Sequence, residues 1–315
     1  MPARLFLRLS LACLVYMTLV LDATAGPRIW VALSDQGGPY EEAAAAVRAG
    51  MDGSADLRSE PWQYLWERKG EKPDLIVTVG VAAMDGTLER LAARDAGWSQ
   101  VPVLAILVPQ AVFEARRAHP AASGRPFGAV VLDQPLGRQL ALIKRALPDR
   151  VRVGVVPGAQ TRPLLSQLER EARSRGLQLV KGPEVRAPED IYPSLREVLV
   201  EADVVLALPD PAIYNANTLQ NILLATYRAR VPLVAFSSAY VKAGALLALY
   251  STPAQVARTA VEVLRQWQAG QGLATLQRPR EFTAAVNPRV ATSLQFLIDD
   301  EAALVADLRR LEGGR

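Results

Sequence analysis

The sequence predicts an α/β protein made of two Rossmann-like lobes, each with a parallel sheet. From Arg28 onward, short apolar runs alternate with amphipathic helical stretches. Several runs are β-branched or leucine-rich without polar alternation, which is typical of parallel strands buried on both faces. About four strand–helix units precede residue 130 and about four follow it, with no low-complexity linker between them. We therefore expect two similar lobes joined by short hinge segments, with a ligand cleft at the carboxyl ends of the strands.

The apolar runs predict strands in a regular series along the chain. The expected strands are Ile29–Leu33, Leu75–Val79, Val103–Val108, Ala129–Leu132, Val151–Val156, Leu177–Val180, Val204–Leu208, Leu233–Phe236 and Ala245–Leu249. Apolar residues spaced three and four apart predict helices over 136–147, 256–267 and 298–311. Pro253 fits the first turn of the second of these helices. Asp210 followed by Pro211 predicts another helix start, with Asp210 as N-cap.

The first 25 residues have the pattern of an export signal. Arg4 and Arg8 form a basic start, an apolar run follows, and Ala23-Thr24-Ala25 gives a small-x-small cleavage site. The apolar run is about 13 residues long, whereas a membrane-spanning helix needs about 20. We expect cleavage before Gly26 and a periplasmic location. Lipidation at Cys13 and an uncleaved N-terminal anchor are the alternatives.

Composition excludes much catalytic and metal chemistry. The chain has one cysteine and one histidine, too few for a structural zinc site or a disulfide framework. It contains no phosphate-binding loop, dinucleotide fingerprint, nucleophile elbow or metalloprotease motif. Its 36 basic and 32 acidic side chains are spread along expected helices, which argues against nucleic-acid binding. We therefore expect no catalytic residues, no metal and no cofactor.

Polar and aromatic residues follow the expected strands, where an open α/β sheet binds ligands. Ser34 and Gln36 follow the first strand, and Gly80 follows the second. Asp210 follows the strand at 204–208. Ser237 and Tyr240 follow the strand at 233–236. Together these residues would place hydroxyl groups, backbone N–H groups and a carboxylate at a cleft, which suits a small polar ligand.

Each of these residues also has a purely structural interpretation. Asp210 can be only an N-cap, and Ser34 and Ser237 can simply cap helices. Tyr240 can pack as an ordinary aromatic at the edge of the core. The joint pattern is better evidence for a ligand site than any single member.

Several segments along the chain form a recognisable set. They are Pro73-Asp74-Leu75-Ile76-Val77-Thr78-Val79-Gly80, Gln134 to Leu140, Ala202 to Val205 with Leu208-Pro209-Asp210, Val231 to Phe236, Val241 to Leu246, and Ala285-Val286-Asn287. This set resembles the substrate-binding proteins of ABC transporters that are related to tryptophan and tyrosine binders, which have the type I periplasmic-binding-protein fold. The resemblance runs over roughly residues 28 to 300. The order and spacing of the segments make the resemblance fairly specific.

The resemblance implies two lobes that close on a small ligand, with two or three strand crossovers as the hinge. It places 26–130 and about 250–278 in lobe 1, and 131–249 and about 279–315 in lobe 2. It also implies the ligand-binding set Ser34, Gln36, Gly80, Asp210, Ser237 and Tyr240. Asp210 would pair with a ligand amino group, and a helix N-terminus beside Ser34 or Gly80 would hold a carboxylate. The segments 34–40 and 250–253 depart from the family's pattern, so the ligand class stays open.

The function that follows is that of a periplasmic solute-binding protein, not an enzyme. It would capture an amino acid or similar molecule and deliver it to an ABC permease, working as a monomer. The alternative is a periplasmic sensor that signals, with ligand bound, to a membrane receptor or kinase. An enzymatic function is a weaker alternative, because the sequence contains no catalytic constellation. A scaffold that has lost its ligand is a further alternative, because the 34–40 loop is unusual.

Overall fold

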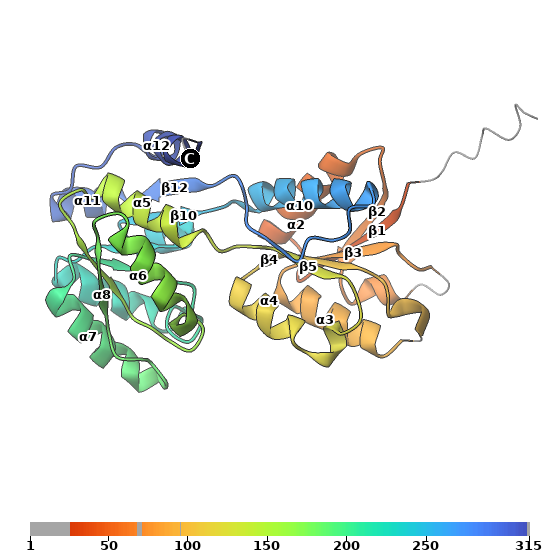
Figure 1. Cartoon of the computed structure of the whole chain (residues 1–315), viewed down its shortest axis with the longest axis horizontal. Helices are drawn as coiled ribbons and strands as arrows, with labels where there is room; N and C mark the ends of the chain where they lie inside the picture. The colour runs from red at the N-terminus through yellow and green to blue at the C-terminus, as the bar shows by residue number, and fades with distance from the viewer. Residues whose placement is uncertain (1–25, 68–70, 95, 314–315) are drawn as a thin grey trace, which may run out of the picture.

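The computed structural model describes residues 26–67, 71–94 and 96–313, which form two α/β lobes side by side along the long axis of the molecule (Figure 1). The predicted export signal, residues 1–25, lies outside the described residues. No helix in the described ranges combines the length and the apolar character that a membrane crossing requires.

The first lobe is built on a sheet of six described strands that all run parallel. In spatial order they are β11 (Leu276–Gln277), β5 (Phe127–Val131), β4 (Val103–Val108), β3 (Leu75–Val79), β1 (Arg28–Leu33) and β2 (Asp56–Pro61). The inner strands β3, β4 and β5 are almost wholly buried, which explains their uninterrupted apolar sequences.

Helices cover both faces of this first sheet (Figure 1). On one face α2 (Gly38–Met51) packs against α10 (Pro253–Gln268), and both contribute to one apolar cluster with β1, β3 and β4. On the other face lie α3 (Val81–Ala92) and α4 (Gln110–Arg117). The first lobe is thus completed by the helix α10 and the strand β11, which come from a part of the chain that follows the second lobe's central strands.

The second lobe also has a sheet of six described strands. In spatial order they are β12 (Thr283–Val286), β10 (Leu247–Tyr250), β9 (Leu233–Ala235), β8 (Val204–Leu206), β6 (Arg152–Val155) and β7 (Gln178–Lys181). Five strands are parallel, and β12 runs antiparallel to β10 at the edge. The sequence predicts only parallel strands, so β12 is an exception to that prediction.

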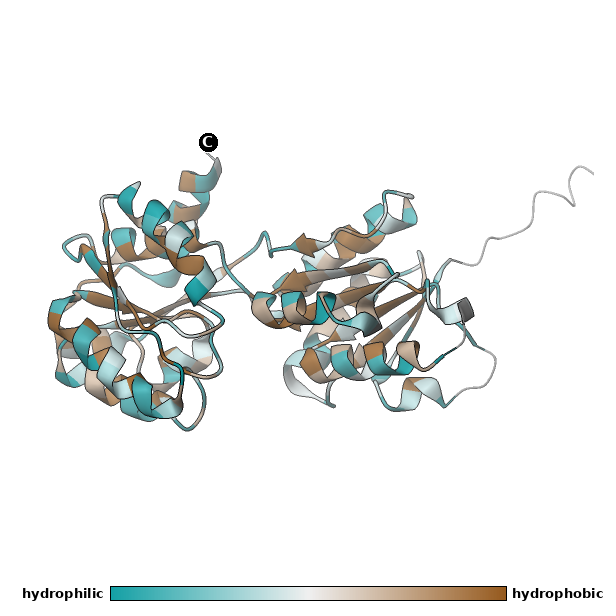
Figure 2. Cartoon of the chain, turned by 60° about the horizontal axis from the view of Figure 1, so that its bottom comes forward, coloured by the Kyte–Doolittle hydropathy of each residue, from teal (hydrophilic) through white to brown (hydrophobic). Residues whose placement is uncertain are grey.

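Two apolar clusters fill the faces of the second sheet. One draws on α5 (Leu136–Ala146), α6 (Leu165–Arg173), α11 (Pro288–Leu294) and α12 (Glu301–Gly313). The other draws on α7 (Ile191–Glu201), α8 (Leu219–Arg228) and α9 (Ser238–Ala243). Figure 2 shows apolar residues along the strands of both lobes and polar residues on the outward sides of the helices. Each lobe therefore has its own core, which is required if the lobes are to move as units.

Three short segments connect the two lobes. Residues 132–135 lead from β5 to α5, residues 251–252 lead from β10 to α10, and residues 278–282 lead from β11 to β12. A connection of this kind allows one lobe to rotate relative to the other by small backbone changes in few residues.

Most predicted elements are present with small shifts of their ends. The nine predicted strands correspond to β1, β3 to β10, and two of the predicted helices correspond to α5 and α10. The third predicted helix, over 298–311, is α12, which begins three residues later at Glu301. The sequence analysis missed β2, β11 and β12, which are polar or very short.

The predicted helix start at Asp210 is wrong. The chain forms turns after Pro211, and α8 begins only at Leu219. Side chains satisfy carbonyl groups that a continuing helix would use. The Asn215 amide donates to Pro211 O, and Thr218 Oγ1 donates to Ile213 O. Such bonds between side chain and backbone compete with helix formation.

Candidate functional site

In the first lobe, Ser34 and Gly80 lie together at the carboxyl ends of β1 and β3. Ser34 N donates to Val79 O, and Ser34 Oγ accepts from Ala83 N at 2.9 Å, so this hydroxyl caps the first turn of α3. Gly80 has φ of 92°, and a Cβ there would lie 2.5 Å from Ser34 Oγ and 2.6 Å from the Tyr40 ring. Only glycine permits this close packing of the loop, helix and ring.

Gln36 lies apart from these residues. Its side chain is exposed in the loop before α2, and its backbone N–H donates to Asp35 Oδ1. The structure therefore places Ser34 and Gly80 in one cluster and leaves Gln36 at its exposed margin.

In the second lobe, Asp210 is buried, with 1% of its surface exposed, at the carboxyl end of β8. Its Oδ2 accepts from Gln160 N at 3.3 Å and Thr161 Oγ1 at 3.5 Å, and its Oδ1 accepts from Ala212 N at 3.1 Å. Asp210 thus joins the loop after β6 to the loop after β8. Every donor is neutral, and no cationic side chain of the described chain lies within 4 Å of this carboxylate.

Three aromatic rings pack beside Asp210. The Phe236 and Tyr240 centroids are 4.8 Å apart, and Tyr214 meets both rings edge-on. Tyr240 Oη donates to Tyr214 O at 3.0 Å. Burial raises the pKa of both phenols, and the charge of Asp210 raises that of Tyr214 further. The rings form an apolar wall at this strand end.

Ser237 lies at the N-cap position of α9, as its structural interpretation expects, and its side chain makes no capping hydrogen bond. It is half-buried, like its neighbour Phe236. The predicted residues of the second lobe, Asp210, Ser237 and Tyr240, therefore all follow the neighbouring strands β8 and β9.

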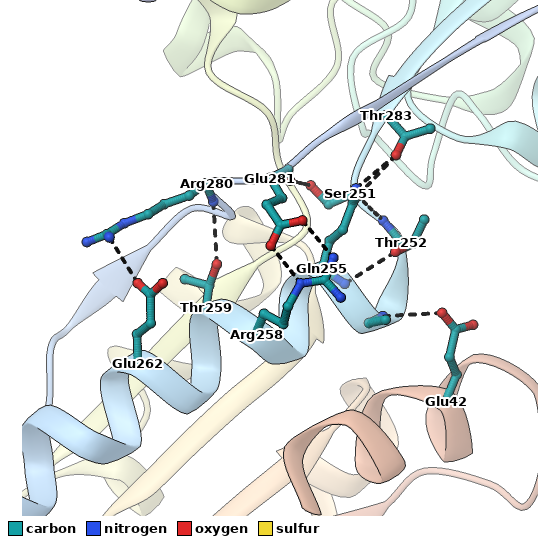
Figure 3. A network of polar contacts seen from close by, with 11 residues as sticks. Glu42, Ser251, Thr252, Gln255, Arg258, Thr259, Glu262, Arg280, Glu281 and Thr283 are labelled. Carbon is teal, nitrogen blue, oxygen red and sulfur yellow. Dashed lines mark hydrogen bonds and ion pairs between the residues drawn. The ribbon is translucent and has the colours of Figure 1, made fainter. Parts of the chain in front are cut away.

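A network of hydrogen bonds joins the three connections between the lobes, and Figure 3 shows the part of it around the second and third connections. Gln134 Nε2 donates to Ser251 Oγ at 2.8 Å, and Ser251 Oγ donates to Glu281 O at 2.6 Å. Gln134 and Ser251 are both buried. On the side drawn in Figure 3, Arg258 of α10 makes a two-pronged ion pair with Glu281, and Gln255 Nε2 donates to Thr283 Oγ1 at 3.0 Å.

A cavity of about 590 Å³ adjoins these connections. It is lined by residues of the first and third connections, of α4, α5, α6 and α12, and by Leu208 and Pro209 after β8. None of the six predicted ligand-binding residues lines this cavity. Among the described residues, no group of three or more histidine, cysteine or acidic side chains is arranged to hold a metal ion.

Two Rossmann-like lobes, three connections between them, and polar loops at the carboxyl ends of both sheets are the features of a two-lobe binding protein. The family model for ABC transporter substrate-binding proteins matches residues 62–308. The chain belongs to this family. Its role is therefore to bind a small molecule for transport, and not to catalyse a reaction. No curated protein matches the chain in sequence.

Solved structures of similar shape include three bacterial proteins. A conserved domain protein from Vibrio cholerae has 18% identity, a TM-score of 0.58, and coverage of 89% of this chain and 97% of its own. An ABC domain in complex with L-Trp from Streptococcus pneumonia has 14% identity, a TM-score of 0.57, and coverage of 88% and 97%. A ligand-free, open substrate-binding protein with adhesive properties from Clostridium difficile has 13% identity, a TM-score of 0.65, and coverage of 87% and 96%. At these identities the similarity concerns the fold.

Gln160 and Thr161 hold Asp210. Their place directly after the predicted strand 151–156 puts them at the expected edge of the sheet, although the predicted ligand-binding set does not include them. Sequence reasoning missed the residues that link the connections. Gln134 and Ser251 are 117 residues apart in sequence, and no local pattern indicates that they meet.

Proposed function

We propose that this protein captures an amino acid or a similar small molecule between its two lobes and delivers it to an ABC permease. Family membership supports a binding role for transport. The polar loops at the carboxyl ends of both sheets support the position of the ligand. A ligand that touches both lobes favours the closed arrangement, because it gains contacts there that the open arrangement lacks.

The observation that carries the proposal is the Asp210 carboxylate, which is buried among neutral donors. A buried charge is costly unless an opposite charge compensates it. In our proposal the ammonium group of the ligand compensates this charge when the lobes close. Tyr240 and Ser237, beside Asp210, would contact the apolar and polar parts of the ligand.

The first lobe would hold the carboxylate of the ligand. Ser34 Oγ caps the Ala83 amide, which leaves the amides of Val81 and Ala82 in the first turn of α3 without a partner in the described chain. The N-terminus of a helix attracts anions through such amides and through the helix dipole. Gly80 allows a ligand to approach this turn, and Gln36 lies at the margin, where it can reach a bound molecule on closure.

We also propose which residues form each lobe and where the mature protein is located. Residues 26–130 and about 250–278 would form the first lobe, and 131–249 with about 279–313 the second, with the three connections as the hinge. Cleavage after residue 25 would release the chain into the periplasm as a monomer, where the ligand-loaded protein meets the permease.

The experiment is a thermal-shift screen of residues 26–315 against amino acids, nucleosides, short peptides and vitamins. A ligand at 100 times its dissociation constant adds roughly 2.7 kcal/mol to the free energy of unfolding, which gives a clear rise in Tm. We expect such a rise with a molecule that carries both an ammonium and a carboxylate group. A rise only with molecules that lack the ammonium group would contradict the proposed role of Asp210.

A further inference from the structure

The cavity beside the hinge is large enough to bind a small molecule. Its volume of about 590 Å³ lies within the range of roughly 300–1,000 Å³ that is usual for ligand pockets. Gln110 and Arg278 contribute from the first lobe and the third connection, whereas α5, α6 and α12 contribute from the second lobe. None of the six residues proposed for the cleft lines this cavity, although Leu208 and Pro209 directly precede Asp210, and the cavity is formed by parts of both lobes.

One end of the cavity is polar and carries both signs of charge. Arg278 Nη2 donates to Gln110 Oε1 at 2.6 Å, and Gln110 N donates to Asp133 Oδ2 at 2.6 Å. No carboxylate of the described chain forms an ion pair with Arg278, and no cation forms one with Asp133. The two groups influence one another electrostatically across Gln110. A cation and a carboxyl group without ion-pair partners thus lie at the same end.

Leucine side chains also line the cavity, among charged and polar side chains of α5, α6 and α12. Leu136 and Leu308 are buried, and Leu208 follows β8. Leu311 on α12 is 56% exposed at the same cavity, which leaves apolar surface for a ligand to cover.

We propose that this cavity is a second ligand site, which binds a small zwitterion with an apolar side chain, such as an apolar amino acid. Arg278 binds its carboxylate, Asp133 binds its ammonium group, and the leucines pack against its side chain. This site uses none of the residues of the proposed cleft. It follows that the protein responds to such a molecule at the hinge as well as between the lobes.

Binding at this site is coupled to the hinge. The cavity includes Gln134 of the first connection, whose side chain donates to Ser251 of the second, and Ser251 donates to Glu281 of the third. A ligand that contacts the first and third connections binds best at one angle between the lobes. By linkage, its occupancy favours that angle and changes the affinity at the cleft.

The test uses 4-fluoro-L-phenylalanine as probe and fluorine NMR of residues 26–315 as readout. Ala141→Phe fills the cavity, since Ala141 lines it on α5, and Arg278→Gln removes the cation. The matched controls are Ala306→Phe on an exposed position of α12 and Arg280→Gln, two residues from Arg278 and outside the cavity. We expect a bound resonance that Ala141→Phe abolishes, that Arg278→Gln weakens about tenfold or more in affinity, and that both controls keep.

Two results would overturn the second site: no bound resonance in the unmodified chain at millimolar probe, or a resonance that both cavity variants keep unchanged. The cleft is tested separately with Asp210→Asn. A resonance that Asp210→Asn removes and the cavity variants keep would support the cleft and reject the hinge site. A resonance with the opposite sensitivity would support the hinge site alone.

Discussion

At the scale of single residues, the candidate site depends on close contacts between neighbouring strand ends. Ser34 caps α3 although it follows β1, and Asp210 holds the loop after β6 although it follows β8. In both lobes a polar side chain from one strand end fixes the backbone of the next. These residues therefore position the loops of the cleft in addition to their proposed contacts with ligand.

Asp210→Asn tests the charge that we assign to the ligand's ammonium group. The substitution keeps the size of the side chain and removes its charge, so affinity for an amino-bearing ligand should fall about tenfold or more. Isothermal calorimetry measures this change. Asp190→Asn is the control, because Asp190 is a half-buried carboxylate of the same lobe that accepts from the Arg186 and Ala187 amides. Equal affinity in the two variants would remove Asp210 from the ligand site.

Gly80→Ala tests the packing in the first lobe. Alanine at φ of 92° is strained and its Cβ would meet Ser34 Oγ, so we expect a loss of about 2–4 kcal/mol in the free energy of unfolding. Gly37→Ala is the matched control, since Gly37 has φ of 86° and no atom within 4 Å of the added Cβ. Urea denaturation should show the smaller loss, about 1 kcal/mol, for Gly37→Ala. Equal losses would mean that the contact with Ser34 contributes nothing.

At the scale of elements, the sequence predicts the inner strands well and the edges poorly. An inner parallel strand such as β3 is buried on both faces, so its residues Leu75–Val79 are apolar and easily recognised. The edge strand β2 is Asp56–Pro61, whose side chains are only partly buried and whose sequence reads as polar. The strand β11 has only two residues, and β12 has the sequence Thr283-Ala284-Ala285-Val286, which lacks a run of large apolar residues; pairing with distant strands defines both.

The contacts of the candidate site could also be predicted from the sequence only in part. Ser34 and Gly80 meet because β1 and β3 are neighbours, which the strand–helix alternation already suggests. The contact between Gln134 and Ser251 requires the chain to leave the second lobe and return to the first, and no local spacing encodes that path. The sequence thus predicts which residues follow strands, but not the hydrogen bonds that link the connections.

An ion pair at the start of β6 is expected to make the stability of the fold depend on pH. Asp203 Oδ2 accepts from the Arg152 and Val151 amides, and Oδ1 accepts from the Arg152 guanidinium. The Arg152 side chain holds the pKa of this carboxyl below its usual range. A lowered pKa stabilises the fold above the unfolded value of about 3.9, and this contribution disappears as the pH falls through the folded pKa.

Asp203→Asn should therefore lower Tm by a few degrees at pH 7 and by progressively less as the pH falls below about 4. Differential scanning calorimetry across this range measures the change. Asp149→Asn, an exposed position of the same lobe, should leave Tm unchanged throughout. A deficit in the Asp203 variant that stays constant down to low pH would contradict the ion pair with Arg152.

At the scale of the whole molecule, the hinge is a set of three connections that share one buried hydrogen-bond network. In the proposed closure the lobes rotate while Gln134, Ser251 and the Glu281 backbone stay linked or exchange partners. The network therefore limits the paths that the lobes can follow.

Ser251→Ala removes the middle of this network. The buried Gln134 amide loses its acceptor, so the free energy of unfolding should fall by about 1–3 kcal/mol. Hydrogen exchange should become faster in residues 132–135 and 278–282, the two connections that lose their hydrogen bonds to Ser251. Ser293→Ala is the control, since the Ser293 hydroxyl is hydrogen-bonded to the Tyr227 hydroxyl on the surface of the second lobe. Unchanged exchange in the Ser251 variant would show that the connections do not depend on one another.

The most direct test of the account is small-angle X-ray scattering of residues 26–315 during titration with the ligand that gives the largest rise in Tm. Capture between the lobes predicts that the radius of gyration decreases with occupancy and that Asp210→Asn needs a higher ligand concentration for the same decrease. Saturation of the protein without any decrease in the radius of gyration would contradict closure of the two lobes on the ligand.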